Sequence, residues 1–409
     1  MSSHDEATAA GHGAHGAQGR AWEIFKVFLK LGLTSFGGPI AHLGYFRDEL
    51  VLRRKWIDDV GYADLVALCQ FLPGPASSQL GFSLGILRGQ GLLGGLAAWL
   101  AFTTPSALVL LAFALGVTAF TGPAAAGFIH GLKLVAVAVV AQAVWGMARS
   151  LAPDRERAAI AVAAVMIVTF VGGSLGQIGA IALGAATGLW VCRNDAAMDA
   201  CGLGVPISRR SGTIALILFA VFLVVPPLIA GTAGQAVALF DAFYRSGALV
   251  FGGGHVVLPL LQAEVVAPGW TTNEVFLAGY GLAQAIPGPL FTFAAYLGAV
   301  VQPAPNGVVG SLIALIAIFL PGLLLVYGTL PYWDALRRRP AAQAAMRGTN
   351  AAVVGILGAA LYSPVWTSAV LAPADFALAL AGFLLLIVWR SPPWIVVVLL
   401  ATAGMVLRV

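Results

Sequence analysis

The sequence predicts an all-α polytopic membrane protein built from two repeats that are inserted in opposite senses. Of the 409 residues, 60% are hydrophobic and only 10% are charged, whereas a soluble domain carries about 25% charged residues. The apolar stretches are long and lack the strict alternation of a β-barrel, which indicates helices. The net charge of +5 is expected in cytoplasmic loops and gives no reason to expect nucleic acid as a partner.

One sequence pattern occurs twice. Residues 28–43 read FLKLGLTSFGGPIAHL, and residues 243–258 read FYRSGALVFGGGHVVL. A Gln-x-x-Pro-Gly-Pro motif follows each copy, at residues 70–75 and 284–289. Loops of the first copy are rich in Lys and Arg, but neither residue occurs between 246 and 336. Because basic loops remain in the cytoplasm, the copies are predicted to be inverted, as in many secondary transporters.

The pattern divides the chain into four parts. They are a disordered cytoplasmic tail (1–21), a first repeat (22–210), a linking transmembrane helix (211–235) and a second repeat (236–409). Each repeat begins with two apolar segments that Gly and Pro interrupt; the four segments cover about 22–50, 60–88, 236–266 and 274–300. Their arms of ~12–15 residues are shorter than the ~20 residues that span a bilayer, which favours re-entrant hairpins. We therefore expect four hairpins and about nine full spans, with a cytoplasmic amino end and a periplasmic carboxyl end.

The four interruptions predict an anion-binding site. Irregular backbone at membrane depth is tolerated where it is buried in protein or lines a cavity. Each interruption starts a new half-helix, whose free N–H groups and positive dipole end favour an anion. The candidate binding residues are Gly37, Gly38, Pro39, Gly74, Pro75, Ser77, Ser78, Gly252, Gly253, Gly254, His255, Gly288 and Pro289, with Gln70 and Gln284 as neutral donors. The alternative is that the interruptions are packing kinks, and that His255 is a hydrogen-bonded packing residue.

Two cations occupy equivalent positions within the apolar segments. Lys30 and Arg245 each precede the phenylalanine of the repeat by six residues. A cation inside a membrane segment costs about 2.5–3.5 kcal/mol on insertion scales, so its presence in both copies suggests that it pairs with a dianion. The alternatives are that each cation snorkels from the end of a half-helix or pairs with a glutamate.

Glu49 and Glu264 are also equivalent, since each follows the phenylalanine of the repeat by thirteen residues. They are candidates for proton coupling, or alternatively for capping the ends of the hairpins. Asn350 is a further binding candidate, because it takes the place in the second repeat of the intramembrane cation Lys133.

Motifs for catalysis or cofactors are nearly absent. Residues 172–176 match Gly-x-Ser-x-Gly, but they fall in a turn between apolar segments and do not follow a strand. The sequence has no P-loop pattern, and its three cysteines lack the spacing of metal ligands. We therefore expect no enzyme activity, no cofactor and no metal site.

The ordered set of motifs resembles the chromate ion transporter family, in its long form with two homologous halves. The motifs are Phe36–Pro39 with Trp56, Gln70–Pro75, Phe251–His255 with Trp270, Pro287–Pro289 and Gly348–Gly355. The resemblance covers nearly all of residues 22–409 and implies chromate efflux across a bacterial inner membrane, use of the proton-motive force and chromate resistance. The motifs leave open whether the substrate is chromate, sulfate or another tetrahedral oxyanion, and whether the protein is an anion channel. The expected partners are the oxyanion and the lipid bilayer, with a homodimer as an open alternative.

Overall fold

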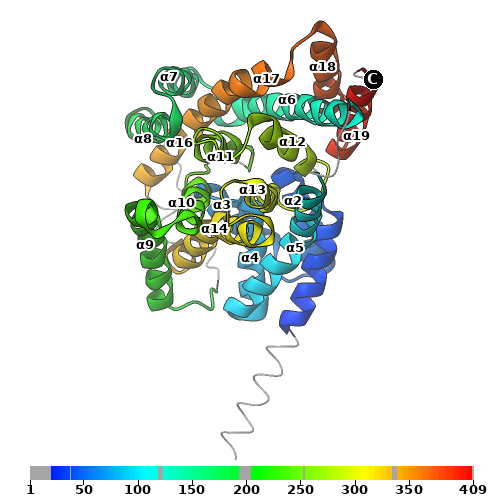
Figure 1. Cartoon of the computed structure of the whole chain (residues 1–409). Coiled ribbons are helices and arrows are strands. Elements are labelled where there is room, and N and C mark those ends of the chain that lie inside the picture. The colour runs from blue at the N-terminus through cyan, green and yellow to red at the C-terminus, as the bar shows by residue number, and fades with distance from the viewer. Residues whose placement is uncertain are drawn as a thin grey trace, which may run out of the picture.

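The computed structural model describes residues 20–36, 38–117, 123–192, 204–251, 254–333 and 339–407. Within these ranges every regular element is a helix, which confirms the all-α class (Figure 1). The expected tail lies almost entirely outside the described residues, and the first described helix begins at residue 20. Gly37, Gly252 and Gly253 also lie outside the described residues.

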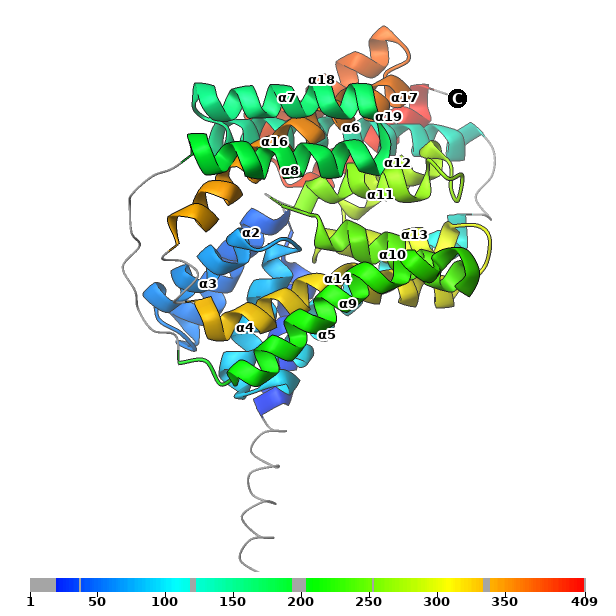
Figure 2. The same cartoon turned by 90° about the vertical axis from the view of Figure 1, so that its left-hand side faces the viewer.

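The four interrupted segments form pairs of short helices, as the Gly and Pro positions predict. In the first repeat, a helix over residues 20–34 precedes α2 (Gly38–Phe46) with the π-helix η1 (Arg47–Arg53), and α3 (Asp59–Phe71) precedes α4 (Ala76–Gly89). In the second, α10 (Gln235–Ala248) precedes η2 (Gly254–Val256) with α11 (Val257–Val265), and α12 (Asn273–Ala283) precedes η3 (Leu290–Thr292) with α13 (Phe293–Val300). Figure 2 places α2 and α3 towards one end of the bundle and α11, α12 and α13 towards the opposite end, as inverted re-entrant hairpins require.

Five helices of the described chain are long and apolar enough to cross a membrane, at residues 92–116, 126–151, 209–233, 307–332 and 340–369. They correspond to α5 (Leu92–Val117), α6 (Pro123–Leu151), α9 (Arg209–Ala233), α14 (Gly307–Thr329) with η4 (Leu330–Tyr332), and α16 (Pro340–Ala360) with η5 (Leu361–Trp366) and α17 (Thr367–Ala369). The linking helix predicted between the repeats is α9.

The other four expected spans are shorter helices. They are α7 (Arg155–Val171), α8 (Gly173–Val191), α18 (Pro373–Ile387) and α19 (Pro393–Leu407). The last two have 15 residues each, so at 1.5 Å per residue each covers about 23 Å of a hydrocarbon core ~30 Å thick. The helices therefore lie at the nine expected positions, but α18 and α19 are short for full spans. Gly172, with φ of 69°, ends α7 and precedes α8, so the turn lies where the sequence predicts it.

The two repeats interlock through close helix contacts. Helix α6 of the first repeat packs against α18 and α19 of the second, and α16 of the second repeat packs against α7 and α8 of the first. Figure 2 shows these six helices as one layer over the layer that contains the hairpins, α5, α9 and α14. Glycines permit the approach: Gly348 of α16 faces Gly184 and Gly188 of α8, and Gly131 of α6 faces Ala401 of α19. Neither repeat therefore buries its long helices alone.

We expect Gly348→Ala to destabilise the protein, because the added methyl group would meet the carbonyl oxygen of Gly184 and lie 2.7 Å from Gly188 Cα. Overpacking of this kind costs about 1–3 kcal/mol. Gly358 lies on the same helix with nothing within 4 Å of an added Cβ, so Gly358→Ala is the matched control and should be neutral or stabilising. Thermal unfolding of the purified protein in detergent measures both, and equal melting temperatures would contradict the packing described here.

Candidate functional site

The interruptions of the two repeats meet at one place. Pro39 and Gly254 occupy equivalent positions in the repeated pattern. They also lie against each other, since a Cβ added to Gly254 would stand 3.2 Å from Pro39 Cγ. Contact between two equivalent positions means that the pseudo-two-fold axis passes between them. The starts of α2 and η2 therefore face each other across this axis.

Two backbone hydrogen bonds join the repeats around the same axis. Gly74 N–H donates to the carbonyl oxygen of Val250 (2.7 Å), and Gly288 N–H donates to that of Ser35 (3.0 Å). Gly74 and Gly288 are equivalent, as are Ser35 and Val250, so the two bonds are symmetry-related. Each Pro-Gly-Pro interruption is thus tied to the first interruption of the opposite repeat.

Glycine is required in both Pro-Gly-Pro motifs. Gly74 and Gly288 have φ of 121° and 109°, values that side chains disfavour. A Cβ added at Gly74 would also stand 3.0 Å from Gly322 Cα, and one added at Gly288 would stand 2.8 Å from Ser106 Oγ. Gly322 and Ser106 belong to α14 and α5, so the long helix after each hairpin pair packs against the interruption of the opposite repeat.

The inner half-helices begin differently from the outer ones. At the outer starts of α3 and α12, the side chains of Asp58 and Thr272 accept hydrogen bonds from Gly61 N–H and Val275 N–H. The inner starts of α4 and η3, at Pro75 and Pro289, have no side-chain cap among the described residues. Uncapped N–H groups at a helix start carry the positive end of the helix dipole. Each outer start therefore has a side chain bonded to one of its free N–H groups, and the inner starts do not.

Several buried side chains surround these inner starts. His42 Nδ1 lies 3.3 Å from Ser77 Oγ, and its Nε2 lies 3.2 Å from the carbonyl oxygen of Ser35. The hydroxyls of Ser35 and Ser78 are buried and have no hydrogen-bond partner among the described residues. Such groups cost free energy unless something binds them. Sequence reasoning did not select Ser35, although its place directly before Phe36 in the repeat could have marked it.

The remaining amide and histidine candidates differ in their surroundings. Gln284 Nε2 is buried without a partner that the described residues supply, whereas Gln70 is exposed on α3. His255 is half-buried and its Nδ1 lies 2.7 Å from Tyr280 Oη, so it has the packing partner that the alternative reading expects. Asn350 lies on α16, which packs against η2, and its Oδ1 is buried.

Both intramembrane cations pair with the equivalent glutamate. Lys30 Nζ lies 3.3 Å from Glu49 Oε2, and Arg245 Nη2 lies 2.9 Å from Glu264 Oε2. Arg245 also binds Asp241 at 2.9 Å. Of the alternatives for these cations, pairing with a glutamate is what the structure shows in each repeat. Neither cation is held within an interruption.

The fold and these contacts define a class of protein: a multi-pass helical transporter with inverted repeats whose interruptions meet on the axis. The sequence profile described as chromate transporter matches residues 22–189 and 237–405, and the chain belongs to the chromate transporter family. A chromate transport protein of Pseudomonas aeruginosa is 29% identical over 93% of this chain and 90% of its own length.

Two further relatives are similar over most of the chain. A probable chromate transport protein of Synechococcus elongatus is 30% identical over 83% of each chain. A chromate transport protein of Cupriavidus metallidurans is 27% identical over 91% of this chain and 90% of its own length. No solved structure matches the chain.

The ion pairs predict unequal losses of stability in two variants. Arg245→Gln removes the cation that Asp241 and Glu264 share. Because the Arg245 side chain is 27% exposed, the loss of unfolding free energy should be smaller than for a fully buried pair, roughly 1–3 kcal/mol. In Lys30→Gln, Glu49 keeps Arg53 and Arg54, and the lost cation is 54% exposed, so the cost stays below about 1 kcal/mol.

Thermal unfolding of the two purified variants compares these losses. Adding Asp241→Asn to Arg245→Gln should restore part of the lost stability, because it removes one of the two carboxylates that Arg245 binds. Equal destabilisation by Lys30→Gln and Arg245→Gln would contradict the assignment of partners.

Proposed function

We propose that the protein is a secondary transporter that exports chromate, or a closely similar tetrahedral oxyanion, from the cytoplasm across a bacterial inner membrane. The observation that carries the proposal is the meeting of the interruptions: two symmetry-related hydrogen bonds and the contact of Pro39 with Gly254 bring inner helix starts of both repeats to one axis. The names of the three chromate transport relatives support chromate as the substrate.

The proposed binding site uses neutral donors. Uncapped backbone N–H groups at the starts of α4 and η3, with the hydroxyls of Ser35 and Ser78, would donate to the oxygens of a dianion. Helix starts bind phosphate-like groups in this way without a formal positive charge. A site without fixed counter-charges can also release its anion, which transport requires.

The membrane potential favours export of a dianion. Moving one charge through 100 mV is worth ~2.3 kcal/mol, so expelling two from a negative interior yields about 4.6 kcal/mol. Proton antiport would add to this drive, and Glu49 and Glu264 are the candidate carriers. The basic residues of the 47–55 loop, and their absence from residues 246–336, support a cytoplasmic amino end.

The inverted repeats suggest how the site changes its access. In the proposed cycle the hairpins of one repeat rock against those of the other about the axis through Pro39 and Gly254. The chromate site would then open to alternate sides without moving far itself. Chromate resistance of the host cell would follow from the export.

Uptake into inside-out vesicles tests the proposal. With the potential clamped at zero and an acidic lumen, a proton-coupled exporter accumulates chromate against its gradient, and an uncoupler abolishes the accumulation. Accumulation that requires an interior-positive potential would instead indicate a potential-driven uniporter or an anion channel. Equal competition by sulfate would broaden the substrate to tetrahedral oxyanions, and no accumulation under either condition would refute the proposal.

Ser78→Ala tests the site itself. A hydrogen bond to a charged group contributes about 1.5–3 kcal/mol, so its loss should raise the KM for chromate roughly tenfold or more. Ser83→Ala is the matched control, because Ser83 is also buried on α4 and donates to the carbonyl oxygen of Gln79. If Ser78→Ala transports with the KM of the parent protein, Ser78 does not bind the substrate.

A further inference from the structure

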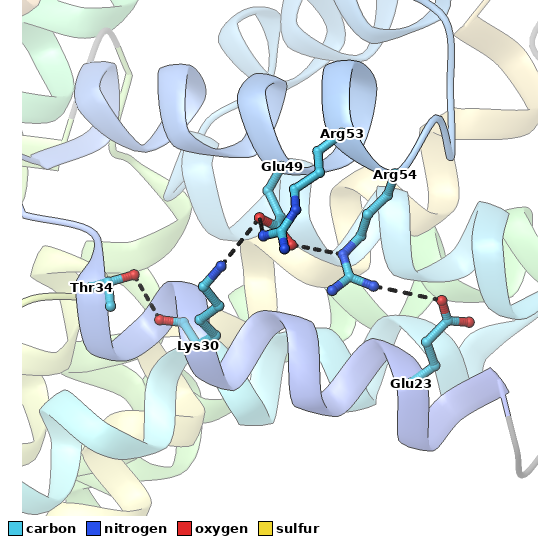
Figure 3. Close-up of polar contacts among 6 residues, drawn as sticks. All are labelled: Glu23, Lys30, Thr34, Glu49, Arg53 and Arg54. Carbon is cyan, nitrogen blue, oxygen red and sulfur yellow. Dashed lines mark hydrogen bonds and ion pairs between the residues drawn. The ribbon is translucent and has the colours of Figure 1, made fainter.

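The two symmetry-related ion pairs have unlike neighbours. We call Glu23, Lys30, Glu49, Arg53 and Arg54 the Glu49 cluster (Figure 3) and Asp241, Arg245 and Glu264 the Arg245 cluster. The Glu49 cluster belongs to the first repeat and the Arg245 cluster to the second. Inversion of the repeats places the two clusters towards opposite ends of the molecule.

In the Glu49 cluster, three cations share one carboxylate. Glu49 Oε1 lies 2.7 Å from Arg54 Nε, and Glu49 Oε2 lies 3.0 Å from Arg53 Nη1 and 3.3 Å from Lys30 Nζ (Figure 3). Glu23 stands 3.8 Å from Arg54 and pairs more closely, at 3.0 Å, with Arg88. The carboxylates of this cluster do not balance its cations, so positive charge remains.

The Arg245 cluster has a different composition, with a single cation. The Arg245 guanidinium lies between two carboxylates. Its Nη2 is 2.9 Å from Asp241 Oδ2 and 2.9 Å from Glu264 Oε2. The difference comes from a few positions: Asp241 occupies the place that Lys26 has in the first repeat. The loop after Glu264 reads Ala267-Pro268-Gly269, where the first repeat has its arginines.

A cavity adjoins the positive cluster. It has a volume of about 380 Å³ and is lined by Trp22, Glu23, Lys26, Val27, Lys30 and Arg54. The side chain of Lys30 is 54% exposed and that of Arg54 is 32% exposed, so both can reach a ligand in the cavity. Lys26 is exposed, and its Nζ stands 5.1 Å from the centre of the Trp22 ring.

We propose that this cavity is an entry site that binds a tetrahedral oxyanion before the anion reaches the interruptions. The inference rests on the proposed function and extends it to the place where the anion first binds. The lining holds three cations, Lys26, Lys30 and Arg54, against the single carboxylate of Glu23. An excess of positive charge in a cleft raises the local concentration of anions and their association rate, with a strong dependence on salt. Positive charge at the entrance attracts the dianion to the cavity.

Kinetics of chromate uptake into inside-out vesicles test the entry site. Lys26→Gln should raise the KM several-fold, leave the maximal rate nearly unchanged and weaken the dependence of uptake on salt. Arg155→Gln is the matched control, because Arg155 is an exposed cation at the start of α7 and lies outside the cavity. Lys26→Asp, which copies the charge found at Asp241, should raise the KM further than Lys26→Gln.

The outcomes separate this inference from the proposed function. If the parent protein transports chromate and Lys26→Gln has an unchanged KM and salt dependence, the entry site is refuted and the transport proposal stands. If the parent protein does not transport chromate, equilibrium dialysis measures chromate binding to the parent protein and to Lys26→Gln. Weaker binding by Lys26→Gln supports the cavity as an anion site. Equal binding by the two proteins refutes it.

The phosphate of an anionic lipid has the same chemistry as the proposed ligand, so a second arm distinguishes the two sources. Native mass spectrometry compares retained phosphatidylglycerol in the parent protein and in Lys26→Gln. Loss of the bound lipid with no change in the KM would show that the cavity holds a headgroup, and it would overturn the entry site. A raised KM with unchanged lipid retention is the result we expect.

Discussion

The structure depends on the hydrogen bonds that Gly74 and Gly288 make to Val250 and Ser35 of the opposite repeat. A helix interrupted at membrane depth loses partners for its backbone groups, and the bilayer supplies no water to replace them. Here each repeat provides part of what the other lacks. The interruptions can therefore exist only where the two repeats meet, and this constraint places the uncapped helix starts on the pseudo-two-fold axis. The same mutual dependence extends to the long helices, since α6 and α16 each pack against helices of the other repeat.

The backbone is nearly symmetric around this axis, but the charges are not. Lys30–Glu49 and Arg245–Glu264 repeat the same pairing, but two arginines, Arg53 and Arg54, join the first pair and a carboxylate, Asp241, joins the second. A symmetric backbone suits a transporter that alternates between two similar states. An asymmetric set of charges would give the two ends of such a transporter different attraction for anions. The two properties reside in different parts of the sequence, so charge can vary without disturbing the interruptions.

Much of the fold could be predicted from the sequence, because an apolar segment that contains Gly-Gly-Pro or Pro-Gly-Pro has few alternatives to an interrupted helix. The sequence leaves open whether Lys30 pairs with Glu49 or with a bound dianion, because spacing alone does not distinguish the two partners. The cross-repeat bonds could not be predicted, since their acceptors are backbone atoms of Ser35 and Val250, whose side chains share no property. Hydropathy places α18 (Pro373–Ile387) and α19 (Pro393–Leu407) correctly, but it locates the end of a helix only to within a few residues.

Opposite insertion of the two repeats is the claim on which this account rests, and side-specific cysteine labelling tests it most directly. Cys69, Cys192 and Cys201 are replaced by alanine, and Lys55→Cys or Ala267→Cys is then added in the exposed loop of a first-repeat or second-repeat hairpin. A membrane-impermeant maleimide should label Lys55→Cys only in inside-out vesicles and Ala267→Cys only in right-side-out vesicles. Labelling of both positions from the same side of the membrane would contradict the inverted arrangement.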